Sequence, residues 1–391
     1  MEKNIELYHN ATKNTYKIGM VTIPISKASV TPLLNLIEIL SCFSDKIFII
    51  TGNEFAKIRL HDKKVSAELV YYNYDARSIS KIVELISLQL KYLFKLLKIA
   101  RKVDFFIFFI GNILVLPIFA SKVSKKKVVM LLAGSSSKAA RYRESPFSKL
   151  LYIIERINFL LANRIIVYSQ NLIKEWNLEK YKQKIIIAHE HFVDLQEFDT
   201  KRKFDERPNL VGFIGRVSAE KGVLNLILAV PLVLSKRRDT CFLICGNGEL
   251  SNKIKETIKN EKLKPYVKVT EWIPHEEIPL RLNELKLLVL PSSTEGLPNI
   301  MLEAMACGTP VLATPVGAIP DIIKDGETGF LLKSNNPKHI ADKIIELLNK
   351  PELLEKVSKN AYNYVREKFS YEKTLKSWRR ILSGTQKDQV I

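Results

Sequence analysis

Short apolar runs, rich in β-branched residues, alternate along this chain with longer segments that have the periodicity of a helix. The run KIGMVTIPI (17–25) is followed by a polar loop and a helical segment, and DKIFIITG (45–52) begins the next unit. Apolar strands that alternate with helices are typical of a parallel sheet covered by helices on both faces. The alternation therefore predicts an α/β chain with doubly wound sheets.

The same alternation starts again after KRKFDERPN (201–209), a charged segment with a proline that we interpret as a linker. Beyond it, LVGFIG (210–215) is a strand that leads into a loop and a helix, and further units follow. With 391 residues the chain is long enough for two domains of ordinary size. We predict Rossmann-like domains over 1–200 and 201–368, with a C-terminal helical region over 369–391.

The segment DFFIFFIGNILVLPIFAS (104–121) is the strongest candidate for a membrane span. Its apolar core of about 16 residues is shorter than the roughly 20 that a spanning helix needs, and Gly111, Asn112 and Pro117 interrupt it. We predict instead a buried strand, a turn and a helix. The first twenty residues contain no apolar core of signal-peptide length, so we expect the protein in the cytoplasm.

The positive charge of the chain is concentrated in one segment. The formal net charge is +20, and residues 81–150 alone hold 14 Lys and Arg residues against three acidic ones, a balance of +11. Such a patch attracts nucleic acid, an anionic membrane or an anionic substrate. No recognised nucleic-acid motif accompanies the charge, so nucleic acid is not expected as a partner.

A long basic helix is predicted within this segment, from Ser80 to Lys102. Its apolar stripe consists of Ile82, Leu85, Ile86, Leu90, Leu93 and Leu97. Another side carries lysines at helical spacing, namely Lys91, Lys95, Lys98 and Lys102. Two interpretations stay open: the helix lies on an anionic membrane surface, or it is an ordinary domain helix with a solvated lysine face.

The stretch SSTEGLPNIMLEAMACG (292–308) offers two carboxylates, Glu295 and Glu303, around the start of a helix predicted from Pro298 to Cys307. The free N–H groups at that helix start and the positive end of the helix dipole form a site for an anion such as phosphate. Glu303 lies one turn further in, where a carboxylate can accept hydrogen bonds from sugar hydroxyls, as acidic residues do with ribose in dinucleotide folds. The alternative is a capped amphipathic helix with a solvated glutamate.

Three more loops follow strands of the second half, so they are expected at the same edge of the sheet. In GRVSAEKG (215–222), Arg216 and Lys221 are two cations in a loop that enters a helix, which suits a diphosphate better than a solvated surface. The glycine turn GNGE (246–249) and the segment EWIP (271–274) follow the next strands, and EWIP could meet the flat edge of a base. Each loop alone is a weak signal, but all of them in this order indicate a nucleotide site.

Neither the histidines nor the cysteines have the spacing of a metal site. His189 and His191 lie two apart and no third ligand has recognisable spacing, so no metal is expected. Cys241 and Cys245 lie in an apolar run and are predicted to be buried, reduced thiols.

Five segments within residues 210–333 resemble, in order and spacing, the motifs of the retaining glycosyltransferases of family four: GRVSAEKG, CGNGEL, VTEWIPHEEIP, PSSTEGLPNIMLEAMACGTPVLATPVGAIPDII and DGETGFLL. The resemblance implies the GT-B fold, in which two Rossmann-like domains face each other across a cleft. It also implies a nucleotide-diphosphate sugar as donor, with no cofactor and no metal. The activity would be retaining transfer of a sugar to a hydroxyl of a glycan or lipid-linked acceptor, in the synthesis of cell-surface polysaccharide or glycoconjugate.

The resemblance implies roles for individual residues as well. Arg216 and Lys221 would bind the diphosphate, and Glu295 would lie against the transferred sugar, which makes these three the catalytic candidates. Glu303 would bind the ribose hydroxyls, the amides near Asn299 and Ile300 the distal phosphate, and the glycine turn and Trp272 the base. The donor-binding candidates as a set are Gly215, Arg216, Lys221, Gly246, Gly248, Trp272, Glu295, Gly296, Leu297, Asn299, Ile300 and Glu303.

The first half departs from the family pattern in its loops. The glycine-rich loop after the first strand is replaced by IPISKAS, and AGSSSK (133–138) occupies the region where the family often has a histidine. Because the acceptor side of such enzymes lies mainly in this domain, the candidates there are Ser26, Lys27, Ser29, Gly134 and Ser135. In the family the last helix packs back on the first domain, which we expect of 369–391. The departures keep one alternative open, a non-catalytic relative that only binds nucleotide-sugar.

Overall fold

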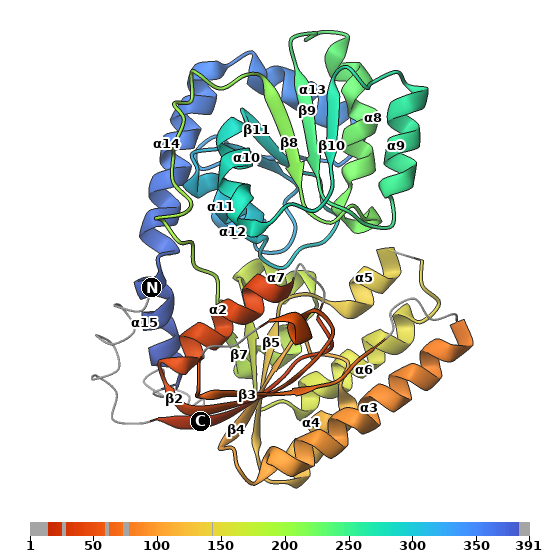
Figure 1. Cartoon of the computed structure of the whole chain (residues 1–391), viewed down its shortest axis with the longest axis vertical. Helices are drawn as coiled ribbons and strands as arrows, with labels where there is room; N and C mark the ends of the chain where they lie inside the picture. The colour runs from red at the N-terminus through yellow and green to blue at the C-terminus, as the bar shows by residue number, and fades with distance from the viewer. Residues whose placement is uncertain (1–14, 26–28, 59–61, 73–77, 143, 383–391) are drawn as a thin grey trace.

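Two parallel α/β domains lie one above the other in the computed structural model of the protein (Figure 1). The structure describes residues 15–25, 29–58, 62–72, 78–142 and 144–382. The two doubly wound sheets confirm the fold class that the alternation of strands and helices predicts.

The first sheet is formed by the N-terminal half of the chain. Its described strands follow the order β3-β2-β1-β4-β5-β6-β7 and pair in parallel throughout. All five residues of the central strand β4 are buried, as expected for a strand with helices on both faces. The strands are β1 (Tyr16–Val21), β2 (Ser44–Thr51), β3 (Val65–Leu69), β4 (Phe105–Phe109), β5 (Lys127–Leu132), β6 (Arg164–Val167) and β7 (Ile185–Ile187).

The second sheet is formed by the C-terminal half. Its described strands follow the order β10-β9-β8-β11-β12-β13, and again each pair is parallel. The strand order changes direction between β8 and β11. Doubly wound sheets bind ligands at the carboxyl ends of the strands beside such a change. The strands are β8 (Leu210–Ile214), β9 (Cys241–Cys245), β10 (Val267–Thr270), β11 (Leu287–Leu290), β12 (Val311–Ala313) and β13 (Phe330–Leu331).

Helices connect successive strands in both domains. The first half contains α2 (Val30–Ser41), α3 (Ser78–Ala100), α4 (Val115–Val123), α5 (Ser136–Tyr142), α6 (Ser148–Leu161) and α7 (Gln170–Glu175). The second half contains α8 (Val223–Leu234), α9 (Ser251–Asn260), α10 (Ile278–Glu284), α11 (Asn299–Ala306), α12 (Ile319–Ile322), α13 (Pro337–Leu348), α14 (Pro351–Lys368) and α15 (Tyr371–Leu382). Short 3₁₀ turns are η2 (Glu54–Lys57), η3 (Glu179–Lys184), η4 (Ala219–Lys221) and η5 (His275–Glu277).

The apolar segment 104–121 forms the buried strand β4, a turn and the helix α4, which confirms the strand–turn–helix prediction. No helix in the described part of the chain is both long enough and apolar enough to cross a bilayer.

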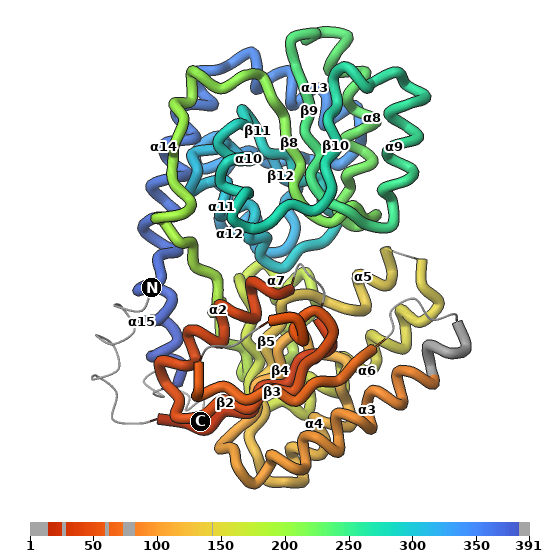
Figure 2. The backbone as a smooth tube through the Cα atoms, in the orientation of Figure 1, coloured from red at the N-terminus to blue at the C-terminus, as the bar shows by residue number. Residues whose placement is uncertain are grey.

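The last helix, α15, lies against the first domain, although the chain reaches it from the second (Figure 2). Trp378 is fully buried, and its indole N–H donates to the His189 carbonyl over 2.9 Å. The Tyr16 hydroxyl donates to the Leu382 carbonyl at the far end of α15. The residue numbers at which the domains divide stay predictions.

The segment 201–209 connects the two domains without forming a helix or strand. It is nevertheless fixed to the second domain, because Arg207 is 3% exposed and its guanidinium donates to the carbonyl oxygens of Leu285 and Cys307. Burial lowers the pKa of Arg207 to about 10, which still leaves the side chain charged at neutral pH.

One detail of the sequence interpretation is wrong. Cys241 lies at the start of β9 and is exposed, whereas Cys245 is buried, because the strand leaves the protein surface only after its first residue. In α3 most of the described apolar stripe lies at the surface: Ile86, Leu90 and Leu97 are exposed, and Leu93 packs against the core. The face that enters the core instead carries Leu88, Tyr92, Leu96 and Ile99.

Candidate active site

A cleft of about 780 Å³ lies between the two domains. It is lined by loops that follow strands: 23–25 after β1 and 133–136 after β5 on one side, with the loops after β8 and β11 on the other. Ligands bind in this place in doubly wound folds, because the loops at the carboxyl ends of parallel strands converge there. The predicted site residues are therefore expected in this cleft.

Glu295 and Lys221 form an ion pair in the wall of the cleft. The Lys221 Nζ lies 2.7 Å from each carboxylate oxygen of Glu295, and the Ser292 hydroxyl donates to one of those oxygens over 2.7 Å. The Glu295 side chain is almost fully buried, and Lys221 is partly buried. The loops after β8 and β11 thus bring together two groups that are 74 residues apart in sequence.

Arg216, the second predicted cation, lies at the start of the loop after β8 and is partly exposed to the cleft. Its Nη2 lies 3.1 Å from a carboxylate oxygen of Glu220, whose side chain is buried. The guanidinium is therefore held from the protein side, with Lys221 in the same cleft wall. Two cations in the loop after β8 create a region of positive potential that suits a diphosphate.

The helix α11 begins at the cleft. It runs from Asn299 to Ala306, so Pro298 occupies the N-cap position and not the first helical position that we predict. Pro298 supplies no side-chain cap, and the Met301 N–H is bonded to the Pro298 carbonyl over 3.1 Å. The amides of Asn299 and Ile300 therefore remain the candidates for binding phosphate at this helix start.

Glu303 lies one turn into α11 and is bonded to a histidine that the sequence interpretation did not assign to the site. The Nε2 of His275 is 2.9 Å from Oε1 of Glu303, and both residues line the cleft. The hydrogen bond to Glu303 raises the pKa of His275, and burial opposes it. A carboxylate with one oxygen held in this way keeps its other oxygen for a further hydrogen bond.

Close packing of the loops depends on two glycines. A Cβ on Gly246 would lie 1.9 Å from the Gly215 carbonyl oxygen, so only glycine lets the turn after β9 lie against the loop after β8. A Cβ on Gly296 would lie 2.1 Å from the carbonyl oxygen of Ala133, which belongs to the first domain. The turn that carries Glu295 therefore touches the loop after β5 directly.

The loop after β5 is held by a buried carboxylate, Glu155 of α6. Glu155 accepts hydrogen bonds from the backbone N–H of Ser136 over 2.7 Å and from the amide of Asn112 over 2.8 Å. The Ser137 hydroxyl donates to the other oxygen over 2.5 Å. Burial raises the pKa of Glu155, and the hydrogen bonds from the serines oppose that effect. Glu155 thereby fixes Gly134 and Ser135 at the edge of the cleft.

Buried titratable residues line the cleft or lie close to it, where β6 and β7 end. The Tyr168 hydroxyl donates to Glu190 over 2.6 Å, and the His191 ring packs edge-on against Tyr168. Burial raises the pKa of Glu190 to about 8 and lowers the pKa of His189 to about 4. Tyr168 and His191 line the cleft, whereas His189 and Glu190 do not, and we assign His189 and Glu190 a role in packing beneath it.

Most of the predicted site residues are brought together in the cleft. Gly248 is an exception: it does not line the cleft, although its turn lies beside it. Ser26 and Lys27 lie outside the described residues. The predicted residues that line the cleft are Ser29, Gly134, Ser135, Gly215, Arg216, Lys221, Gly246, Trp272, Glu295, Gly296, Leu297, Asn299, Ile300 and Glu303. Their roles stay predictions.

Four further residues of the site were missed from the sequence. Ser292 and His275 bond the two key carboxylates, Glu220 pairs with Arg216, and Glu155 holds the serine loop. A signal existed for His275, which lies three residues after Trp272 in a loop already assigned to the site. No comparable signal exists for Glu155, which lies in the middle of an amphipathic helix.

No group of three or more His, Cys, Asp or Glu side chains in the described part of the chain is arranged to hold a metal ion. The expectation of a metal-free site stays a prediction.

Two Rossmann-like domains that face each other across a cleft define the GT-B class of fold. A solved structure of this class superposes on the whole of this arrangement. The HepE protein of Anabaena, crystallised with UDP, superposes with a TM-score of 0.73 over 94% of this chain and 100% of that chain, at 17% identity. Residues 194–364 match the family described as "Glycosyl transferases group 1". The match lies mainly in the second domain and agrees with the expected family, and the expected GT-B fold is confirmed.

Curated relatives match over part of their length. The capsular polysaccharide biosynthesis glycosyltransferase CapM of Staphylococcus aureus is 29% identical over 56% of this chain and 61% of its own. The alpha-D-kanosaminyltransferase of Streptomyces kanamyceticus is 31% identical over 49% of this chain and 51% of its own. The chain thus spans between half and two thirds of the length of these relatives.

Proposed function

We propose that this protein is a retaining glycosyltransferase, which moves a sugar from a nucleotide-diphosphate sugar to a hydroxyl group of an acceptor. The observation that carries the proposal is the Lys221–Glu295 ion pair beside Arg216 and the start of α11, in a cleft between two domains. Two cations and a helix start suit a diphosphate, and carboxylates suit sugar hydroxyls. The names of the relatives, both sugar transferases, support the same activity.

In the proposed complex the diphosphate lies between Arg216, Lys221 and the amides of Asn299 and Ile300. The ribose hydroxyls donate to Glu303, whose position His275 fixes. Trp272 and the turn at Gly246 contact the base. The diphosphate competes with Glu295 for the ammonium group of Lys221. Glu295 therefore gives up part of its contact with Lys221 and contacts the transferred sugar.

The proposed reaction breaks the bond between the sugar C1 and the phosphate oxygen. The bonding electrons remain on the diphosphate, where Arg216, Lys221 and the helix start stabilise the new charge. The sugar passes through an oxocarbenium-like state beside Glu295. The acceptor oxygen forms the new bond to C1 from the face that the phosphate leaves, and its proton goes to the leaving phosphate oxygen. The anomeric configuration is therefore retained.

We place the acceptor against the first domain, beside Ser29 and the serine loop that begins at Gly134 and Ser135. A glycan or a lipid-linked saccharide fits the proposal, since both present hydroxyl groups. CapM acts, by its name, in capsular polysaccharide biosynthesis, which supports a role for this chain in cell-surface polysaccharide synthesis. We propose the cytoplasm, or the cytoplasmic face of a membrane, as its location.

The proposal is tested by incubating the protein with a panel of UDP- and GDP-sugars and measuring release of the nucleoside diphosphate. One donor is expected to be hydrolysed slowly without acceptor, and Arg216→Ala to lower this rate by about a hundredfold or more, because a preorganised charge is lost. Glu367→Gln, an exposed change in α14, is the control. Binding of a nucleotide-sugar without any turnover, with or without glycan acceptors, would instead identify a non-catalytic binding protein. An inverted product linkage would refute retention.

A further inference from the structure

Three helices on the outer side of the first domain expose apolar side chains as continuous stripes. Each stripe has the spacing of one helical face, with residues three or four positions apart. The exposed residues are Val83, Ile86, Leu90, Phe94 and Leu97 of α3, Leu116, Phe119 and Val123 of α4, and Leu150, Ile153, Ile157 and Leu160 of α6. We call this surface the α3–α4–α6 face.

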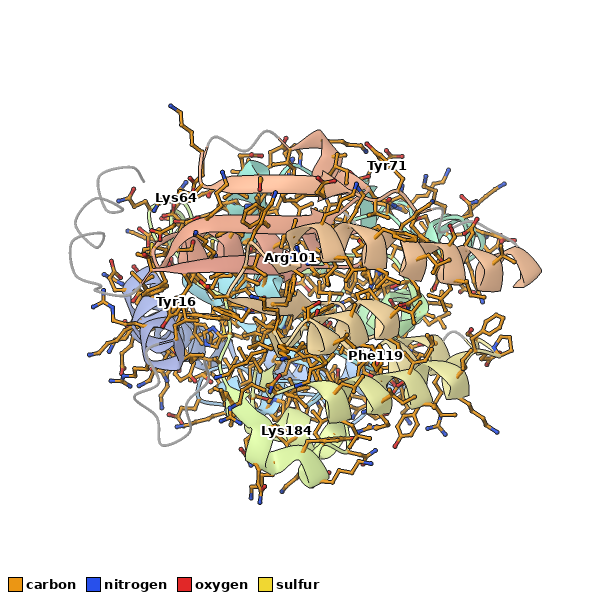
Figure 3. All side chains as sticks on the ribbon, turned by 90° about the horizontal axis from the view of Figure 1, so that it is seen from below. Tyr16, Lys64, Tyr71, Arg101, Phe119 and Lys184 are labelled. Carbon is orange, nitrogen blue, oxygen red and sulfur yellow. The ribbon has the colours of Figure 1, made fainter. Side chains whose placement is uncertain are left out.

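The helices that form the α3–α4–α6 face pack side by side. α4 contacts both α3 and α6, and Figure 3, in which Phe119 of α4 is labelled, looks onto all three. Figure 1 places them on the side of the first domain that points away from the second domain. The three stripes therefore form one surface and not scattered positions.

The exposure is not a consequence of poor packing of the helices. The opposite side of α3 enters the core through Leu88, Tyr92 and Leu96, and α6 buries Asn158 and Phe159. Phe94 and Phe119 are 63% and 56% exposed, which leaves most of each ring in water. Isolated exposed apolar residues are normal on a soluble domain, whereas large contiguous patches mark sites of interaction with a partner or a membrane.

Positive charge accompanies the apolar stripes. Lys91, Lys98 and Arg101 of α3 are exposed on the same helix. A hollow of about 610 Å³ opens beside the ends of α4 and α6, and its lining includes Lys122, Arg164 and Lys184. Burial, and after it the nearby Lys122 ammonium group, lowers the pKa of Lys184. An apolar surface bordered by cations matches the boundary of an anionic bilayer, where acyl chains lie beneath phosphate groups.

We infer that the α3–α4–α6 face docks the protein on the surface of an anionic lipid bilayer. The apolar stripes enter the boundary between headgroups and acyl chains, and the lysines contact lipid phosphates. A second copy of this chain is a poorer partner, because a two-fold contact would bring equal positive charges together. The inference names one face of three helices, whereas the sequence alone indicated only the basic segment 81–150 and the long helix within it. It does not depend on the proposed activity.

α6 connects the α3–α4–α6 face to the cleft on the other side of the first domain. It packs against α5, and α5 begins in the serine loop that lines the cleft. If the protein is the glycosyltransferase proposed above, an acceptor anchored in the same bilayer extends along α6 and α5 to the cleft.

The test is flotation of the full-length protein with vesicles of phosphatidylcholine, with and without about one phosphatidylglycerol in three lipids. The wild-type protein is expected to float with the anionic vesicles at low salt. Phe94→Ser, Phe119→Ser and Ile153→Ser, combined, are expected to lower the bound fraction more than about tenfold, because large apolar side chains are lost from the contact. The matched control combines Leu228→Ser, Leu232→Ser and Leu280→Ser, which are exposed on the second domain.

The outcomes separate the explanations. Because all the substituted residues are exposed, both triple variants are expected to unfold at the temperature of the wild-type protein, within a few degrees. Equal flotation of both triple variants would overturn the inference, as would a wild-type protein that stays unbound at low salt. The wild-type protein could instead sediment as a dimer and bind no vesicles, with only the first triple variant sedimenting as a monomer. That result would assign the face to a second copy of the chain and overturn the inference of bilayer docking.

Discussion

At the scale of single residues, the charged side chains of the cleft neutralise one another. Lys221 holds Glu295 through both of its oxygens, and His275 holds Glu303. Charged groups removed from water require a partner, since an unpaired buried charge costs several kcal/mol. The pairs preserve the charges in the absence of a donor, and a diphosphate that enters the cleft must compete with Glu295 for Lys221.

The His275–Glu303 hydrogen bond predicts a pH dependence of stability. The bond raises the pKa of His275, with Glu197 and Glu276 adding to the effect. A raised pKa in the folded protein stabilises it fully below the unfolded value of about 6.5, and this contribution is lost as pH rises through the folded value. We expect His275→Gln to lower the unfolding temperature more at pH 6 than at pH 8.5, as measured by differential scanning fluorimetry.

Glu303→Gln supplies the control for this experiment, because it removes the charge that faces His275. In that background the substitution of His275 should have nearly the same effect at both pH values. If His275→Gln lowers the unfolding temperature of the otherwise wild-type protein by the same amount at pH 6 and at pH 8.5, the proton on His275 contributes nothing to folding.

The sequence predicted which residues line the cleft but not how they pair. Arg216, Lys221 and Glu295 could be placed because each follows a strand, and the ends of parallel strands converge. Their partners depend on side-chain directions across loops that are distant in sequence. His275 became part of the site only when the loops were seen together, since no spacing rule relates one loop to another. Ser292 lies three residues before Glu295 in the same loop, but spacing alone does not show that its hydroxyl points to that carboxylate.

At the scale of elements, α3 shows where periodicity is insufficient. Its sequence has apolar residues on two sides, and the stripe that periodicity identified, which includes Ile86, Leu90 and Leu97, is largely exposed. Hydrophobic periodicity locates an apolar stripe but cannot state which of two stripes packs on a neighbour. The exposed stripe is informative, because a second apolar side is what a surface bound to a further partner requires.

The turn between β11 and α11 gives a prediction about the contact between the domains. In Gly296→Ala the new methyl group would lie 2.1 Å from the Ala133 carbonyl, so the two loops must move apart. We expect the two domains to open and nucleoside diphosphates to bind at least about tenfold more weakly, since the binding groups are no longer positioned together. Isothermal titration calorimetry measures the affinity, and small-angle scattering measures the opening.

Gly134→Ala is the matched control for the scattering measurement. It lies in the facing loop, but a Cβ there has no atom within 4 Å, so the change adds a methyl group without a clash. We expect its radius of gyration to equal that of the wild-type protein. An unchanged radius for Gly296→Ala as well would mean that the loops adjust locally and that this contact does not control the spacing of the domains.

At the scale of the whole molecule, the alternation of strands and helices was sufficient to predict two doubly wound sheets. The family resemblance, and not the alternation, implied that the two domains face each other across a cleft, and the contacts between the domains were not predictable. Asn171 of α7 donates to Asp321 and to the Gly317 carbonyl across the domain boundary, and Gly317 in turn donates to Glu175. Short helices such as α7 and α12 leave almost no periodic signal, so hydrogen bonds between them cannot be read from sequence.

The return of α15 to the first domain yields the last prediction. Trp378 is fully buried and bonded to the His189 carbonyl, so Trp378→Ala should remove about 3–5 kcal/mol from the stability of the first domain. Because the second domain keeps its own core, calorimetry should then resolve two unfolding transitions, with the earlier one in the first domain. Trp378→Phe, which loses the hydrogen bond but keeps most of the ring, should cost only about 1–2 kcal/mol.

Trp272→Ala changes the same residue type at a site that is 40% exposed and should leave both transitions in place. A single transition in Trp378→Ala, shifted no further than in Trp272→Ala, would mean that α15 does not tie the second domain to the first.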